Sequence, residues 1–190
     1  MGVSAIILAG GRATRMGGID KGLVLINQQP MVAHVIDRLK PQVDEIFINA
    51  NREIAQYSKF SYPVLQDTVH DFAGPLAGFQ LGLTHAQHPY LLTAPCDSPF
   101  LPQDLSQRLL KALLAHDADI AVATTHGKNH PVLSMCKTIT LPHLNQYLAQ
   151  GGRKVNAWQK NLRYIEVDFS DCADAFANIN TFNDLEQYKK

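Results

Sequence analysis

The stretch VSAIILAGGRATRMGGIDK, residues 3–21, decides the fold of this chain. Its first six residues form an apolar run interrupted only by Ser4, which is typical of a buried strand. Residues 10–21 then contain four glycines and three cationic side chains, Arg12, Arg15 and Lys21. Glycines let backbone N–H groups face an anion, and arginine and lysine supply the positive charge that a polyphosphate requires. A strand that runs into such a loop indicates a triphosphate site in an α/β fold.

The loop matches neither of the two commonest phosphate-binding motifs. It contains no G-x-x-x-x-G-K-[ST], and no G-x-G-x-x-G opens a helix. A surface loop with chance arginines is the alternative. The pattern L-A-G-G-x-x-x-R-M-G followed by Lys21 nevertheless resembles the signature of nucleotidyltransferases that activate a phosphate or sugar phosphate with an NTP. With Gly10 where others carry alanine, it most resembles the molybdenum cofactor guanylyltransferases.

Composition bounds the class of protein. The chain has 190 residues, of which 46% are hydrophobic and 18% charged, and this balance predicts one globular domain over residues 1–190. Seventeen basic and seventeen acidic residues cancel, which argues against nucleic-acid binding. No apolar run approaches a membrane span and no signal peptide opens the chain, so we expect a cytoplasmic protein without membrane contact. Three widely spaced cysteines indicate reduced thiols, and the lack of a heptad pattern favours a monomer.

Strand and helix patterns alternate along the chain. Apolar residues recur at helical spacing after Pro30, and again after Pro102, where five leucines are predicted to share one face: Leu105, Leu109, Leu110, Leu113 and Leu114. Further helices are predicted between Arg52 and Pro63, over residues 74–85, near 141–148, around Trp158 and from Thr181, which opens a capping-box-like pattern ending at Asp184. Strands are predicted at residues 3–8, 45–49, 63–67, 90–94, 119–124, 131–136 and 163–169. This order predicts an α/β, three-layer α/β/α sandwich around a mostly parallel, Rossmann-like sheet.

Polar residues stand where three of these strands end. Asn49, Asp67 and Asp97 each follow an apolar run, and open α/β sheets bind ligands beyond the carboxyl ends of their strands. Asp97, in P-C-D-S-P, is therefore the candidate ligand for Mg²⁺, which takes one or two carboxylates and completes its shell with phosphate oxygens and water. The alternative is that these side chains only cap helices or satisfy turns.

Transfer of a nucleotidyl group from an NTP to a phosphate requires no general base. A phosphate monoester has a second pKa near ~6, so at neutral pH it is already a nucleophile. Catalysis then consists of positioning and of neutralising charge. We expect Arg15 and Lys21 to bind the triphosphate and Asp97 to hold the metal, and these three are the predicted catalytic residues.

The resemblance covers nearly the whole chain and implies a nucleotide-diphospho-sugar transferase fold. It implies transfer of GMP from GTP to the terminal phosphate of molybdenum-loaded molybdopterin, with the nucleotide in the N-terminal part and the pterin in the C-terminal part. It also implies transient contacts with molybdenum-insertion proteins and molybdoenzyme chaperones. Ala13 departs from the family, which often has serine there. The implied nucleotide-binding residues are Leu8, Ala9, Gly10, Gly11, Lys21, Asn49, Asp67, Gly74, Gly78 and Asp97. The implied molybdopterin-binding residues are His130, Pro131, Arg153, Lys154, Asn178 and Asn180.

Two other functions stay open at this point. One is a cytidylyl- or sugar-phosphate nucleotidyltransferase on the same scaffold, and the other is a non-catalytic carrier of the molybdenum cofactor. Arg153 and Lys154 also fit a solvated helix start, and Asn180 fits a simple turn. The spaced pairs His126/His130 and His85/His88 lack further ligands and are interpreted as surface or packing residues.

Overall fold

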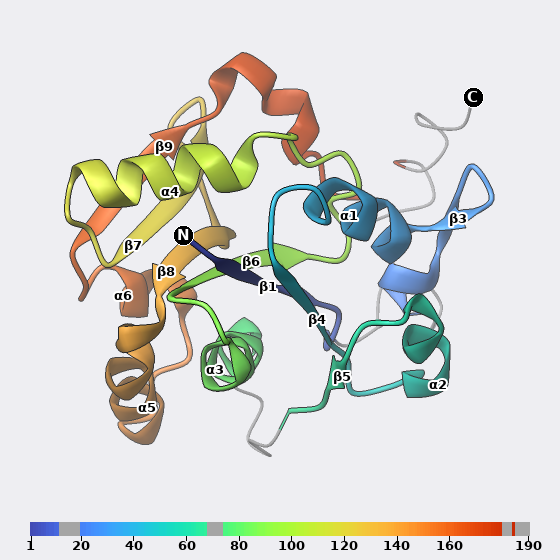
Figure 1. Ribbon diagram of the computed structural model, residues 1–190, viewed down its shortest axis with the longest axis horizontal. Helices are drawn as coiled ribbons and strands as arrows, with labels where there is room; N and C mark the ends of the chain where they lie inside the picture. The colour runs from blue at the N-terminus through green and yellow to red at the C-terminus, as the bar shows by residue number, and fades with distance from the viewer. Residues whose placement is uncertain (12–19, 68–73, 180–183, 185–190) are drawn as a thin grey trace.

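The computed structural model describes residues 1–11, 20–67, 74–179 and 184, and within these residues seven strands form one sheet (Figure 1). The spatial order is β5-β4-β1-β6-β8-β7-β9. All strands run parallel except β8, which is antiparallel to both of its neighbours. The mostly parallel sheet predicted from the sequence is therefore confirmed. The strands are β1 (Val3–Leu8), β4 (Glu45–Asn49), β5 (Val64–Leu65), β6 (Tyr90–Pro95), β7 (Ile120–Thr125), β8 (Lys128–Lys137) and β9 (Tyr164–Asp168).

Helices cover both faces of the sheet. On one face lie α1 (Met31–Leu39) and α4 (Leu105–Ala115), and on the other lie α3 (Pro75–His85), α5 (Leu141–Ala149) and α6 (Val155–Gln159) (Figure 1). The side chains of β1 show the same division, because Ala5 and Ile7 pack with α1 while Ile6 packs with α3. Successive side chains of a strand point to opposite faces, so a central strand that buries apolar side chains on both faces requires a layer on each side. The three-layer sandwich is confirmed.

The helix faces predicted from leucine spacing are correct except at one position. In α4 the side chains of Leu105, Leu109 and Leu113 are fully buried, whereas Leu114 is 43% exposed. Leu114 follows Leu105 by nine residues, which at about 3.6 residues per turn is two and a half turns. The two side chains therefore lie on opposite sides of the helix, and the inclusion of Leu114 in the buried face was wrong.

Several short elements surround the sheet. The helix-like stretch predicted between Arg52 and Pro63 is confirmed as α2 (Ile54–Tyr57) and η2 (Ser58–Phe60), whereas the other short elements were not predicted from the sequence pattern. Asn27 and Gln28 have positive φ angles and form the turn of a small hairpin. The predicted capping box from Thr181 lies almost wholly outside the described residues, of which only Asp184 is included. No helix in the described part of the chain is both long and apolar enough to cross a membrane. The other short elements are η1 (Lys21–Leu23), β2 (Leu25–Ile26), β3 (Gln29–Pro30), η3 (Thr138–Thr140) and η4 (Ser170–Phe176).

Strand β8 contains a bulge that shapes the edge of the ligand-binding region. Val122 of β7 pairs with Ser134, but the next residue, Ala123, pairs with His130, so residues 131–133 are looped out of the ladder. Pro131 has no N–H to donate, and proline inside a sheet is confined to such irregularities. The carbonyls freed by the bulge accept from side chains instead: Thr93 Oγ1 donates to Val132 O at 2.6 Å, and Gln159 Nε2 donates to Pro131 O at 2.8 Å.

Candidate nucleotide-binding site

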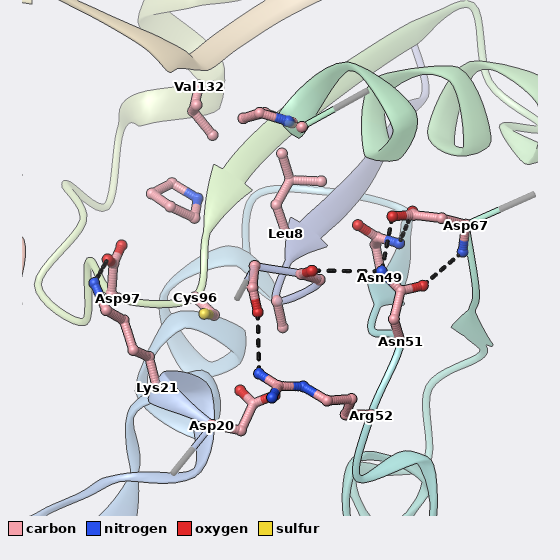
Figure 2. Close-up of a pocket in the computed structure, with 16 residues that line it drawn as sticks. Leu8, Asp20, Lys21, Asn49, Asn51, Arg52, Asp67, Cys96, Asp97 and Val132 are labelled. Atoms are coloured by element: carbon pink, nitrogen blue, oxygen red, sulfur yellow. Dashed lines mark hydrogen bonds and ion pairs between the residues drawn. The ribbon is translucent and has the colours of Figure 1, made fainter. Parts of the chain in front are cut away.

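A cavity of about 760 Å³ opens at the carboxyl ends of the parallel strands β1, β4, β5 and β6 (Figure 2). The glycine motif and the polar strand ends were predicted to meet at this edge of the sheet. Gly78 does not line this cavity. The lining residues are Leu8, Ala9, Gly10, Gly11, Asp20, Lys21, Asn49, Asn51, Arg52, Asp67, Gly74, Pro75, Pro95, Cys96, Asp97 and Val132.

One side of the cavity is a closed network of two asparagines and an aspartate. Asp67 accepts from Asn49 Nδ2 at 2.8 Å on Oδ1 and from Asn51 Nδ2 at 2.7 Å on Oδ2. The backbone N–H of Asp67 donates back to Asn51 Oδ1 at 2.8 Å. Asn51 was not among the predicted site residues, although the spacing N-A-N was a usable signal, because alternate residues of an extended chain face the same side.

Gly78 does not line the cavity but packs against two side chains that do, Leu8 and Asn49. A Cβ atom added at Gly78 would lie 2.4 Å from Leu8 Cδ2 and 2.8 Å from Asn49 Oδ1. Helix α3 therefore packs directly against the side chains that line the cavity, at a distance that only glycine allows. Gly74 precedes α3 with a φ of +59°, a conformation that favours glycine, and Pro75 occupies the first turn of the helix.

The opposite side of the cavity carries the Lys21–Asp97 ion pair. The Lys21 Nζ atom lies 3.4 Å from Asp97 Oδ2, and the two side chains are 23% and 16% exposed. Figure 2 shows this pair facing the cavity across from Asn49 and Asp67. Lys21 of the glycine motif and Asp97, 76 residues later in the chain, thus meet near the carboxyl ends of β1 and β6.

The donor set fits a metal ion that is shared with a substrate. No group of three or more histidine, cysteine or acidic side chains with the geometry of a metal site occurs among the described residues. An all-protein cage at Asp97 is therefore not formed by this part of the chain. Magnesium is commonly bound by one or two carboxylates together with phosphate oxygens and water, and a single strand-end carboxylate at a cavity that other polar side chains also line meets that requirement.

Cys96, next to Asp97, is buried against the turn that carries Lys21. Burial, with a smaller contribution from the charge of Asp97, raises the pKa of the Cys96 thiol far above its usual range. The thiol therefore stays protonated and behaves as a small buried apolar residue rather than as a nucleophile.

Only part of the predicted cationic loop is described. Arg15, which was predicted to bind the triphosphate, lies outside the described residues. Arg52 lines the cavity and its Nη2 donates to the carbonyl oxygen of Gly11 at 3.3 Å. Arg52 was missed as a site residue, although it directly follows the N-A-N segment in the sequence.

The residues implied for the second substrate separate into two groups. Pro131 and Lys154 line a second cavity of about 510 Å³ beside α6. Val132 of the β8 bulge lines this cavity as well as the first one, so the two cavities meet at that side chain. The remaining lining residues are Val155, Asn156, Ala157 and Lys160.

The other implied residues do not line the second cavity. His130 Nε2 contacts Thr125 Oγ1 at 2.7 Å, and burial followed by the charge of Lys128 lowers the pKa of its imidazole. Arg153 Nη1 donates to the carbonyl oxygen of Leu148 in α5 at 3.0 Å and to that of Gly152 at 2.8 Å. Asn178 Oδ1 accepts from Ser98 Oγ at 2.6 Å, beside Asp97 in the chain, and Asn180 lies outside the described residues.

A cavity at the carboxyl ends of parallel strands, with glycine backbone, amide groups and a lysine–aspartate pair, is typical of nucleotide-binding α/β domains. Residues 5–163 match the MobA-like NTP transferase domain family. The chain is 50% identical to a molybdenum cofactor guanylyltransferase of Ralstonia nicotianae, over 97% of this chain and 95% of that protein. It is 46% identical to the protein of the same name from Shewanella loihica, over 97% and 94% of the two chains. The chain therefore belongs to the MobA-like NTP transferase family and, within it, to the molybdenum cofactor guanylyltransferases.

Solved structures confirm the fold. Molybdopterin-guanine dinucleotide biosynthesis protein A of Archaeoglobus fulgidus superposes with a TM-score of 0.81 at 20% identity, over 98% of this chain and 96% of that one. CMP:2-keto-3-deoxy-manno-octonic acid synthetase in complex with CTP superposes with a TM-score of 0.74 at 14% identity, over 98% and 96%. These structures share the mostly parallel α/β fold that was expected from the sequence.

Proposed function

We propose that this protein transfers GMP from GTP to the terminal phosphate of molybdenum-loaded molybdopterin, releasing pyrophosphate, as a monomer in the cytoplasm. The observation that carries the proposal is the Lys21–Asp97 pair, which faces a cavity floored by the backbone of the glycine motif. The whole-length similarity to proteins named molybdenum cofactor guanylyltransferase supports the choice of substrates. Contacts with molybdenum-insertion proteins and molybdoenzyme chaperones belong to the same proposal.

The two sides of the cavity suggest how GTP lies in it. Lys21 and Asp97 form the side suited to the triphosphate, whereas the asparagines and Asp67 form the side suited to the nucleoside. The backbone of Leu8 to Gly11 lies between them and lines the cavity. Val132 marks the side from which the second cavity, proposed for the pterin, approaches the first.

The reaction joins an oxygen of the acceptor phosphate to the α-phosphorus of GTP and breaks the bond from that phosphorus to the bridging oxygen of pyrophosphate. The electron pair of the broken bond leaves with pyrophosphate. Because the acceptor phosphate is already ionised at neutral pH, no side chain has to remove a proton. Lys21 would neutralise charge on the triphosphate, and Asp97 would hold Mg²⁺, which when bound reduces the repulsion between the two anionic substrates.

The first test is thermal stabilisation by each of the four NTPs with Mg²⁺, on the unmodified protein, Lys21→Ala and a control, Lys111→Ala. Lys111 is an exposed lysine of α4. A ligand at about one hundred times its Kd adds roughly 2.7 kcal/mol of stability, or about 5–10 °C in Tm for a chain of this size. We expect a shift with GTP that is lost in Lys21→Ala and kept in Lys111→Ala. A shift with CTP or UTP but not GTP would overturn the guanine assignment, and no shift with any NTP would overturn the site.

Turnover separates an enzyme from a carrier. With GTP and molybdenum-loaded molybdopterin, we expect pyrophosphate release by the unmodified protein and a loss of at least a hundredfold in Asp97→Asn. Equal binding of GTP without pyrophosphate release in either protein would favour a non-catalytic carrier. Omitting Mg²⁺ from the same assay tests the metal requirement, and unchanged release in the presence of a chelator would refute it.

A further inference from the structure

The turn that carries Lys21 is held by a buried carboxylate. Asp20 is 7% exposed and its Oδ1 atom accepts from the backbone N–H of Gly22 at 3.2 Å, which caps η1. The same oxygen accepts from the hydroxyl of Tyr57 at 2.5 Å. Tyr57 is the last residue of α2 and is fully buried. A side chain from a different element therefore fixes the residue immediately before Lys21.

The same turn is in close contact with the segment that carries Asp97. A Cβ atom at Gly22 would lie 2.5 Å from the Tyr57 hydroxyl oxygen and 3.3 Å from Cys96 Cβ. Gly22 and Cys96 are the chain neighbours of Lys21 and Asp97. The chain packs closely at Gly22 and Cys96, and Tyr57 also contacts Gly22. This packing brings the Lys21 and Asp97 side chains to within 3.4 Å of each other.

The Tyr57 hydroxyl has a function that packing alone does not explain. Phenylalanine would fill the same apolar space, whereas a buried hydroxyl is tolerated only when it is hydrogen-bonded. Burial, together with the hydrogen bond to Asp20 and the charge of that carboxylate, raises the pKa of Tyr57 far above its usual range, so the phenol remains a donor at every working pH. Asp20 also brings negative charge to the lining of a cavity proposed for a polyphosphate, which is unfavourable for binding by itself.

We infer that Tyr57 and Asp20 are positioning residues that hold the Lys21 turn so that its ammonium group faces the triphosphate beside Asp97. This inference rests on the proposed function, because it concerns the same nucleotide site. In it the Asp20 carboxylate serves as a hydrogen-bond acceptor, and neither its charge nor metal coordination is required. The hydroxyl of Tyr57 and one oxygen at position 20 are the atoms that matter.

The first experiment compares Tyr57→Phe with Tyr164→Phe by calorimetric titration with GTP and Mg²⁺. Tyr164 is a matched control, because its hydroxyl accepts from Asn129 Nδ2 at 2.6 Å and donates to Glu166 at 3.1 Å on β9, outside the cavity lining. We expect the Kd for GTP to rise about tenfold in Tyr57→Phe and to stay within twofold in Tyr164→Phe. In turnover, KM for GTP should rise in Tyr57→Phe while KM for the pterin substrate is unchanged, a split that general destabilisation does not produce.

A second pair of variants isolates the acceptor. Asp20→Asn keeps an oxygen for both donors, whereas Asp20→Ala removes it. We expect about tenfold weaker GTP binding in Asp20→Ala and recovery to within about threefold of the unmodified protein in Asp20→Asn. If Asp20→Asn binds as weakly as Asp20→Ala, the charge is required and the inference is wrong. This comparison also decides the matter if Tyr57→Phe does not fold.

The outcomes for the two proposals can be told apart. GTP binding that is equal in Tyr57→Phe and the unmodified protein overturns the inference and leaves the proposed function standing. If the unmodified protein binds CTP in place of GTP, the guanine assignment fails and the same ratios are measured with CTP. If it binds no NTP, both proposals fail.

Discussion

Replacing Gly78 by alanine tests how tightly α3 packs against the strand ends that carry the cavity. The added Cβ would lie 2.4 Å from Leu8 Cδ2 and 2.8 Å from Asn49 Oδ1, so both side chains must move. Leu8 can turn toward the cavity that it lines, but Asn49 is buried and bonded to Asp67 at 2.8 Å. The cost of the substitution is therefore concentrated at Asn49.

The magnitude follows from three opposing terms. Alanine in place of glycine inside a helix gains about 1 kcal/mol. Overpacking costs about 1–3 kcal/mol, and weakening the hydrogen bond of Asn49 to a carboxylate costs roughly another 1 kcal/mol. We expect Gly78→Ala to lower the free energy of unfolding by about 2 kcal/mol, which for this chain length is about 4–8 °C in Tm.

The assay is urea unfolding, with Gly11→Ala as the matched control. A Cβ at Gly11 would meet no described atom within 4 Å, and Gly11 is not among the glycines with positive φ. The same methyl group added there should change the free energy of unfolding by less than about 0.5 kcal/mol. If Gly78→Ala is as stable as Gly11→Ala or more stable than the unmodified protein, the inferred close contact between α3 and Asn49 is wrong.

Two further substitutions test packing and charge elsewhere in the fold. Leu109→Ala, at a fully buried position of α4, should cost about 2–5 kcal/mol, whereas Leu114→Ala, on the exposed side, should cost less than about 0.5 kcal/mol; equal losses in urea unfolding would contradict the assigned helix face. Hydrogen bonds from Arg163 hold the pKa of Asp119 below its usual range. The Arg163–Asp119 pair therefore stabilises the fold fully at pH values above the ordinary carboxyl pKa. This stabilisation is lost as the pH falls through the lowered pKa of Asp119. Asp119→Asn should therefore cost about 0.5–1 kcal/mol at pH 7 and nothing measurable once the carboxyl is protonated in acid, and a difference that persists at low pH would refute the assignment.

The local sequence pattern was sufficient to predict the fold class and several of the residues that line the cavity. Strand and helix periods depend on residues close in the chain, so the buried face of α1 and the strands β1, β4 and β6 were predicted correctly from spacing alone. The positions of Asn49, Asp67 and Asp97 followed from one rule, that carboxyl ends of parallel strands meet at one edge. The glycine motif also indicated the family, which the comparisons confirm.

Contacts between distant segments depended on strand order and register, which no local pattern contains. Asn51 meets Asp67 because β4 and β5 are neighbours with a particular pairing, and Tyr57 meets Asp20 because α2 packs under the turn at η1. The bulge that brings Val132 to both cavities arises from pairing across β7 and β8 and from the missing N–H of the preceding proline.

The sequence by itself determined the kind of protein: a parallel α/β sheet with a cationic glycine loop and a carboxylate at a strand end, because periodicity and composition are properties of neighbouring residues. Only the tertiary structure decided which side chains complete the site. Lys21 and Asp97 are 76 residues apart, and their approach depends on Gly22 lying against Cys96 with Tyr57 beneath. Such contacts depend on close packing between distant segments, where one added Cβ atom is enough to push two side chains apart.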